Sequence, residues 1–133
     1  MAGMPGRILR GESILLVEDD APLREMYRSA LRSAGFAVVA VNDGAAALRH
    51  VDEWIPSAVV LDLGLPHVGG RDVHRELKMR DDTRDIPVIV VSGNDMSDLD
   101  AEEFASLLPK PIDPDALVRN VEFAVRRARP ATT

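Results

Sequence analysis

Short apolar runs alternate with segments of helical periodicity along most of the chain. The runs with strand-type residues are 14–17, 37–41, 58–61, 87–91 and, more weakly, 107–108. Between most of them, apolar residues recur three and four positions apart, a spacing that places them on one face of a helix. The pattern predicts strands and helices in alternation, without an internal repeat.

Turn and cap residues set the bounds of the predicted helices. Pro22 stands near the start of a helix that reaches residue 34, and Gly35 ends it. The remaining helices are expected over residues 45–54, 71–79 and 114–127. The run at 87–91 is apolar at almost every position, which is typical of a strand covered on both faces. The fourth strand is therefore expected in the interior of the sheet.

Alternating strands and helices imply a parallel sheet with right-handed crossovers. The predicted fold class is α/β, with a doubly wound, five-stranded parallel sheet of the flavodoxin-like type and strand order 2-1-3-4-5. Such a sheet has a switch point between strands 1 and 3. Ligands bind there, outside the carboxyl ends of the strands.

Length and composition indicate a single domain. A chain of 133 residues buries roughly 68% of the surface that its unfolded form exposes, which is enough for one core. We expect a flexible N-terminus over residues 1–12, one domain over 13–128 and a C-terminal tail over 129–133. A net charge of −6 argues against direct binding to nucleic acid. Because the chain has no cysteine and no long apolar run, we expect a cytoplasmic protein without membrane insertion.

Charged residues follow three of the predicted strands. Glu18, Asp19 and Asp20 follow the first strand, Asp62 follows the third, and Lys110 follows the fifth. The carboxyl ends of parallel strands share one edge of a sheet, so these side chains should meet. Crowded carboxylates repel one another unless a cation lies among them, and oxygen ligands suit Mg²⁺. The sequence therefore predicts a magnesium and phosphoryl site.

Four stretches of the chain resemble the receiver domain of two-component response regulators: ILLVEDDAPLREM, VVLDLGLP, VIVVSGND and LPKPID. The resemblance extends over residues 13–127. Each motif is weak alone, but the order of an acidic pair, Asp-x-x-x-Pro, Ser with a small residue and Lys-Pro is specific. Asp62 follows Asp19 by 43 positions, and Ser92 follows Asp62 by 30, which fits the family.

The resemblance implies that Asp62 is the phosphoryl acceptor, which takes the group from a phosphohistidine to form an aspartyl phosphate. Glu18 and Asp19 match the acidic pair that holds Mg²⁺, with Asp19 as the more direct ligand and Glu18 able to act through water. Gly64 should offer its backbone carbonyl to the metal. Asp20, which precedes a helix opened by proline, is instead expected to cap that helix.

Two more residues match positions that contact the phosphoryl group. Ser92 can donate its hydroxyl to a phosphoryl oxygen, and Lys110 would set an ammonium against the same oxygens. Gly93 leaves room for the group. The resemblance also implies a cis peptide bond between Lys110 and Pro111.

The chain departs from the family pattern at two places. Leu107 stands where many receivers carry a tyrosine or phenylalanine that turns inward on phosphorylation, so that kind of switch cannot operate here. The stretch from Ser92 to Lys110 is about one helical turn shorter than usual, which predicts a shortened fourth helix over residues 96–105. We expect phosphorylation to change mainly the loops after Asp62 and Ser92.

These features predict a receiver domain that accepts a phosphoryl group on Asp62, with Mg²⁺, from a sensor histidine kinase or a histidine phosphotransfer protein. It would signal to a downstream protein through altered contacts and would catalyse only its own phosphorylation and dephosphorylation. A stand-alone regulator and the receiver part of a longer protein are both compatible with the sequence.

Two alternatives are weaker. A phosphohydrolase of the haloacid dehalogenase type also uses a nucleophilic aspartate and Mg²⁺, but it needs Asp-x-Asp, and here Gly64 holds the third position. A phosphate-independent scaffold is disfavoured because no catalytic position of the family is lost.

Overall fold

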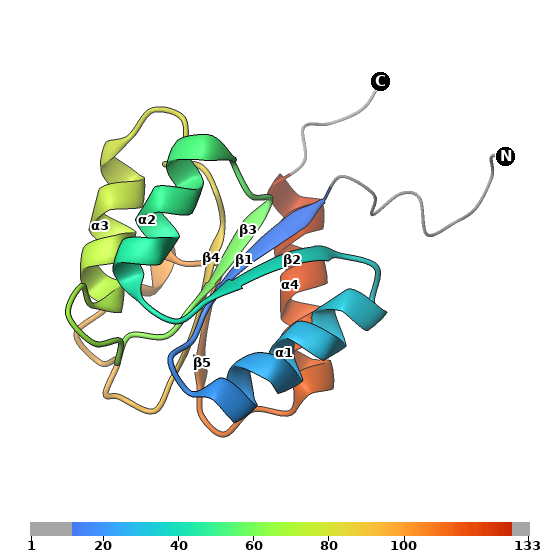
Figure 1. The fold of residues 1–133 in the computed structure, drawn as a ribbon. Coiled ribbons are helices and arrows are strands. Elements are labelled where there is room, and N and C mark those ends of the chain that lie inside the picture. The colour runs from blue at the N-terminus through green and yellow to red at the C-terminus, as the bar shows by residue number, and fades with distance from the viewer. Residues whose placement is uncertain (1–11, 129–133) are drawn as a thin grey trace, which may run out of the picture.

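A computed structural model describes residues 12–128 as a five-stranded parallel sheet with helices on both faces (Figure 1). The strands are β1 (Ser13–Val17), β2 (Ala37–Val41), β3 (Ala58–Leu61), β4 (Val88–Ser92) and β5 (Ser106–Pro109). Their order is β2-β1-β3-β4-β5, which confirms the predicted fold class. The expected flexible N-terminus, apart from residue 12, and the expected tail over 129–133 lie outside the described residues.

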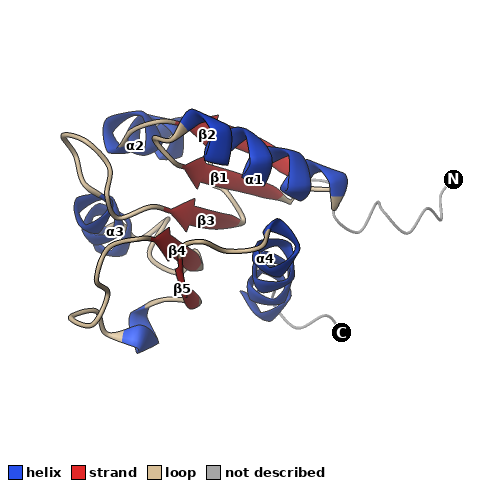
Figure 2. Ribbon diagram, turned by 90° about the horizontal axis from the view of Figure 1, so that it is seen from below, coloured by secondary structure: helices blue, strands red, loops and turns tan. Residues whose placement is uncertain are grey.

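Two layers of helices enclose the sheet (Figure 2). The helices are α1 (Ala21–Ser33), α2 (Gly44–Glu53), α3 (Gly70–Met79) and α4 (Pro114–Ala128). One face packs against α1 and α4, and the other packs against α2 and α3. Within the described part of the chain, no helix combines the length and the apolar character needed to cross a membrane.

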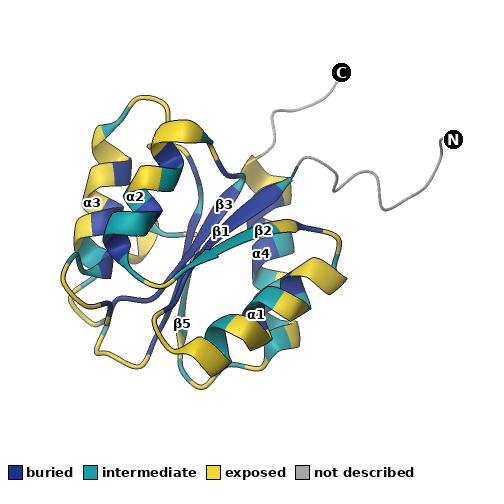
Figure 3. Cartoon of the chain, in the orientation of Figure 1, coloured by how far each residue is buried: buried dark blue, intermediate teal, exposed yellow. Residues whose placement is uncertain are grey.

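The central strands are buried on both faces because their side chains alternate between two cores. In β1, Ile14 and Leu16 join the core under α1 and α4, whereas Leu15 and Val17 join the core under α2 and α3. All five residues of β4 are likewise buried, as its apolar run predicted. Figure 3 shows β1 and β3 buried along their length, and β2 less so. Each of these central strands therefore contributes side chains to both cores.

Helix α1 begins and ends at the residues that the sequence indicated. The side chain of Asp20 accepts a hydrogen bond of 3.1 Å from the backbone N–H of Leu23, so Asp20 is the N-cap, as expected. Gly35 follows the cap residue Ala34 with a φ of 104°, a left-handed conformation that favours glycine. The chain can therefore turn sharply from α1 into β2.

The connection from β4 to β5 contains no regular helix. A single 3₁₀ turn, η2 (Ala101–Glu103), is the helical structure in it, which confirms the predicted shortening; it is the unlabelled turn below β5 in Figure 2. Met96, Leu99 and Phe104 from this connection are partly buried against the core under α2 and α3. An irregular segment thus covers the part of the sheet where a fourth helix was expected.

Helix α3 starts directly against the loop that follows β3. A methyl group added to Gly70 would overlap the backbone carbonyl of Asp62 and would lie 2.7 Å from the Cα of Leu63. A methyl group on the neighbouring Gly69 would meet nothing closer than 3.9 Å. Gly70 therefore allows a close approach that fixes the backbone of Asp62.

We expect Gly70→Ala to lower the free energy of unfolding by about 1–3 kcal/mol, the usual cost of overpacking, because the backbone of Asp62 and Leu63 must move. Gly69→Ala is the matched control and should cost less than about 1 kcal/mol, since the position is an N-cap with space around it. Urea unfolding followed by circular dichroism measures both. Equal stability of the two variants would contradict the close packing of Gly70.

Candidate functional site

The side chains expected to form a site meet at the carboxyl edge of the sheet. Glu18 and Asp19 follow β1, Asp62 follows β3, Ser92 ends β4 and Lys110 follows β5. Strands β1 and β3 are neighbours, and the helices that follow them cover opposite faces of the sheet. This is the switch point of the fold, where the chain leaves room for a ligand.

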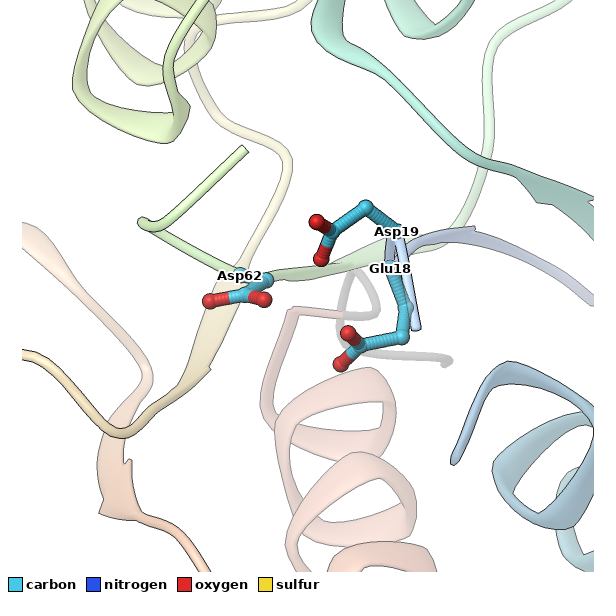
Figure 4. Close-up of side chains that lie close together, drawn as sticks. All are labelled: Glu18, Asp19 and Asp62. Atoms are coloured by element: carbon cyan, nitrogen blue, oxygen red, sulfur yellow. The ribbon is translucent and has the colours of Figure 1, made fainter. Parts of the chain in front are cut away.

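Three carboxylates form a compact cluster at this edge. In Figure 4 the side chains of Glu18 and Asp19 turn toward that of Asp62. One oxygen from each residue lies within 4.8 Å of the others. Glu18 and Asp62 are only 1% and 6% exposed, whereas Asp19 is open to solvent. Burial weakens the screening by water between Glu18 and Asp62, so the repulsion between these two like charges is strengthened.

Lys110 supplies the opposite charge. Its Nζ lies 2.9 Å from Oε1 of Glu18 and 3.1 Å from Oδ2 of Asp62. Burial lowers the pKa of Lys110, but the hydrogen bonds and charges of Glu18 and Asp62 outweigh that effect and raise it overall. The ammonium is therefore protonated at neutral pH. The peptide bond between Lys110 and Pro111 is cis, as expected.

One ammonium cannot neutralise three carboxylates. Burial raises the pKa of Glu18, and the nearby charge of Asp62 raises it further, although hydrogen bonds from Lys110 and from the backbone of Asp20 act the other way. The cluster keeps a net negative charge when its acids are ionised. A divalent cation with oxygen ligands, such as Mg²⁺, matches both this charge and this donor set. Glu18, Asp19 and Asp62 are the residues that could hold it.

Backbone N–H groups fix the two buried acids. The N–H of Gly64 donates to Oδ1 of Asp62 at 3.0 Å, and the N–H of Asp20 donates to Oε2 of Glu18 at 3.1 Å. With Lys110 on the other oxygens, each carboxylate is held on both sides. The expected role of the Gly64 carbonyl toward a metal stays a prediction.

Ser92 is fully buried at the end of β4. Its Oγ accepts a hydrogen bond of 3.0 Å from the N–H of Asn94, which leaves the hydroxyl proton available to an acceptor. A methyl group on the adjacent Gly93 would meet nothing within 4 Å, so the space at that position is open. The expected roles of Ser92 and Gly93 toward a phosphoryl group stay predictions.

Sequence reasoning did not identify Arg24 as part of this site. Its guanidinium donates to the backbone carbonyls of Glu18 at 2.9 Å and of Asp19 at 3.5 Å, which ties the acidic loop to α1. A cation in the first turns of a helix opposes the helix dipole. That unfavourable position was the available signal that Arg24 has a specific partner.

Comparisons with a family model, with curated proteins and with solved structures agree on one family. The family model for the response regulator receiver domain matches residues 14–122. Response regulator MprA of Mycobacterium leprae (strain TN) is 35% identical over 122 residues, which cover 88% of this chain and 52% of MprA. The chain therefore spans about half the length of the curated relatives it matches.

Two solved structures are also similar to this chain along nearly their whole length. A sensor protein from Polaromonas sp. JS666 has a TM-score of 0.82 at 28% identity, covering 89% of this chain and 98% of that chain. The receiver domain of a sensor histidine kinase from Pseudomonas aeruginosa PAO1 has a TM-score of 0.77 at 28% identity, covering 86% and 98%. That receiver domain was solved with a magnesium ion coordinated in its active site cleft.

Asp19 and Asp20 are adjacent but have different contacts, which makes them a matched pair. We expect Asp19→Ala to weaken Mg²⁺ binding by more than about tenfold, since even an outer-shell partner is commonly worth that much. Asp20→Ala should leave Mg²⁺ binding near the parent value, but should cost about 1 kcal/mol of stability through the lost N-cap. Titration calorimetry and urea unfolding measure the two effects. Equal losses of Mg²⁺ affinity would rule out this division of roles.

Proposed function

Because this chain belongs to the response regulator receiver domain family, we propose that it accepts one phosphoryl group on Asp62 and passes the signal on through altered protein contacts. The observation that carries the proposal is the position of Asp62. Its buried carboxylate lies at the switch point, beside two other carboxylates and in contact with Lys110. A carboxylate in that setting is a positioned nucleophile whose charge the ammonium of Lys110 offsets only in part.

The proposed reaction is a transfer between two nucleophiles. A carboxylate oxygen of Asp62 attacks the phosphorus of a phosphohistidine on a donor protein. The new phosphorus–oxygen bond forms as the phosphorus–nitrogen bond breaks, and the bonding electron pair stays with the imidazole nitrogen. Hydrolysis of the aspartyl phosphate returns the carboxylate and releases inorganic phosphate.

The other site residues are proposed to neutralise negative charge on the phosphoryl group. Phosphoryl transfer depends mainly on positioning the reacting groups and on neutralising this charge. Glu18, Asp19 and Asp62, with the Gly64 carbonyl, would hold Mg²⁺, which neutralises charge on the phosphoryl oxygens when bound. Lys110, whose ammonium contacts the Asp62 carboxylate, would contact the oxygens of a phosphoryl group on that residue. Ser92 would donate its hydroxyl to a phosphoryl oxygen, and Gly93, where an added methyl group would meet nothing within 4 Å, would leave room for the group.

The donor is proposed to be a sensor histidine kinase or a histidine phosphotransfer protein, and its docking surface is proposed to include α1. Leu23, Met26, Pro111 and Ile112 line an open cavity of about 330 Å³ that also reaches Lys110. Met26 is 41% exposed. An apolar side chain of the donor could enter this cavity and bring a phosphohistidine to the nearby site. The downstream partner is proposed to be a protein.

The chain is not a classical enzyme: the proposed catalysis is limited to its own phosphorylation and dephosphorylation. The haloacid dehalogenase alternative is not favoured, since the matched family is the receiver domain and Gly64 takes the place of the second aspartate of that enzyme class. A phosphate-independent scaffold is also weaker, because the acidic pair, Asp62, Ser92 and Lys110 are all present at one edge.

Acetyl phosphate with Mg²⁺ should add one phosphoryl group to the parent protein, and intact-protein mass spectrometry detects it. Asp62→Asn should abolish the addition because an amide cannot act as the nucleophilic carboxylate. Asp82→Asn is a matched control at a solvent-exposed aspartate and should be labelled like the parent. Undiminished labelling of Asp62→Asn would refute the assignment of the acceptor.

A further inference from the structure

The acidic loop, residues 18–20, joins β1 to α1 and carries two of the three clustered carboxylates. Its first residue is fixed to the sheet, because the N–H of Glu18 donates to the carbonyl of Val41 at 3.1 Å. Its last residue is fixed to the helix, because Asp20 is the N-cap of α1 and its carbonyl accepts from the backbone N–H of Arg24 at 2.8 Å. The backbone between these two anchors needs a further partner.

That partner is the side chain of Arg24. Its guanidinium Nη1 donates to the carbonyl of Glu18 at 2.9 Å and to the carbonyl of Asp19 at 3.5 Å. Within residues 12–128, these two carbonyls accept no other hydrogen bond. Glu18 is buried, so its carbonyl depends on a donor from the protein. Arg24 therefore holds the backbone from which both loop carboxylates extend.

Arg24 does not neutralise the acids whose backbone it holds. No ion pair joins it to a carboxylate of the described residues. Arg28, one turn later in α1, pairs instead with Glu25 at 3.0 Å. The two loop carboxylates turn toward Asp62 (Figure 4). The guanidinium thus supports the loop while the carboxylates stay available to a cation.

Arg24 has two opposite effects on a cation at the cluster. Its positive charge repels the cation, but the side chain is only half-buried, so water and salt screen this effect. Its hydrogen bonds fix the backbone of two of the three candidate ligands. Loss of an outer-shell partner commonly weakens metal binding by roughly tenfold to a hundredfold. Removal of the side chain should therefore weaken binding, even though it makes the site more negative.

We propose that Arg24 is a positioning residue for the cation site: it holds the carbonyls of Glu18 and Asp19 so that their carboxylates are directed at Asp62 before a cation binds. The inference rests on the proposed Mg²⁺-dependent phosphorylation of Asp62. Arg24 acts through the backbone of the acidic loop and not through contact with the cation. Helix α1 thereby contributes to the metal site, although none of the candidate ligands lies on it.

Titration calorimetry with Mg²⁺ on the full chain tests the proposal. Arg24→Met keeps an apolar stem without the charge or the donors, and we expect its dissociation constant for Mg²⁺ to rise by about tenfold. Arg24→Ala should show the same rise. Arg28→Met is the matched control, because it removes an equal charge from the same helix without a contact to the acidic loop. It should bind Mg²⁺ as the parent does or slightly more tightly.

Two further measurements separate positioning from damage to the fold. Circular dichroism shows whether each titrated sample is folded. Without metal, the nitrogen-15 heteronuclear NOE of the Asp19 and Asp20 amides reports fast motion of the acidic loop. We expect this NOE to fall in Arg24→Met and to keep its parent value in Arg28→Met. Labelling of Asp62 by acetyl phosphate should be lower in Arg24→Met at low Mg²⁺ and should recover as Mg²⁺ is raised.

The outcomes distinguish this inference from the proposed function. Unchanged or tighter Mg²⁺ binding by folded Arg24→Met would overturn the positioning role, because loss of the charge alone has that effect, and would leave the phosphorylation of Asp62 intact. An equal loss of affinity in Arg28→Met would also overturn it. Failure of the parent both to bind Mg²⁺ and to accept phosphate from acetyl phosphate would overturn the proposed function, and the inference with it.

Discussion

Repulsion among Glu18, Asp19 and Asp62 is the constraint on which the carboxyl end of the sheet depends. The strand order puts the ends of β1 and β3 side by side, and burial removes much of the water that would screen Glu18 from Asp62. Lys110 and two backbone N–H groups offset part of the repulsion. The remainder is charge that a bound divalent cation would offset. The carboxylates that repel one another are thus the same groups that could hold a metal ion.

Most of the fold could be predicted because apolar periodicity and turn residues act locally. The bounds of β2 and β3 agree with the expected runs, while the weak run at 107–108 is extended to Ser106–Pro109 by pairing with β4. The meeting of Glu18, Asp62 and Lys110 followed from one geometric rule, that parallel strands share a carboxyl edge. The shortening of the expected fourth helix was predicted from the small number of residues between Ser92 and Lys110.

The features that escaped prediction depend on contacts between distant segments. The contacts of Arg24 with two carbonyls depend on the path of the loop before α1, which no local pattern specifies. The stack of His74 on Phe104 joins an element of regular helix to an irregular segment, and periodicity describes only the first of these. The close approach of Gly70 to Asp62 was likewise hidden, because the sequence shows a glycine pair but not which member is crowded.

The ammonium that bridges β1 and β3 comes from the residue after the last strand, and this has a consequence for the order of folding. Parallel pairings between distant segments close large loops and form slowly. Until β5 pairs with β4, Glu18 and Asp62 lack the Lys110 counter-charge that the complete sheet provides. A nascent or partly folded chain therefore carries these two carboxylates without their counter-charge. Completion of the sheet and pairing of the buried acids with Lys110 thus occur in the same step.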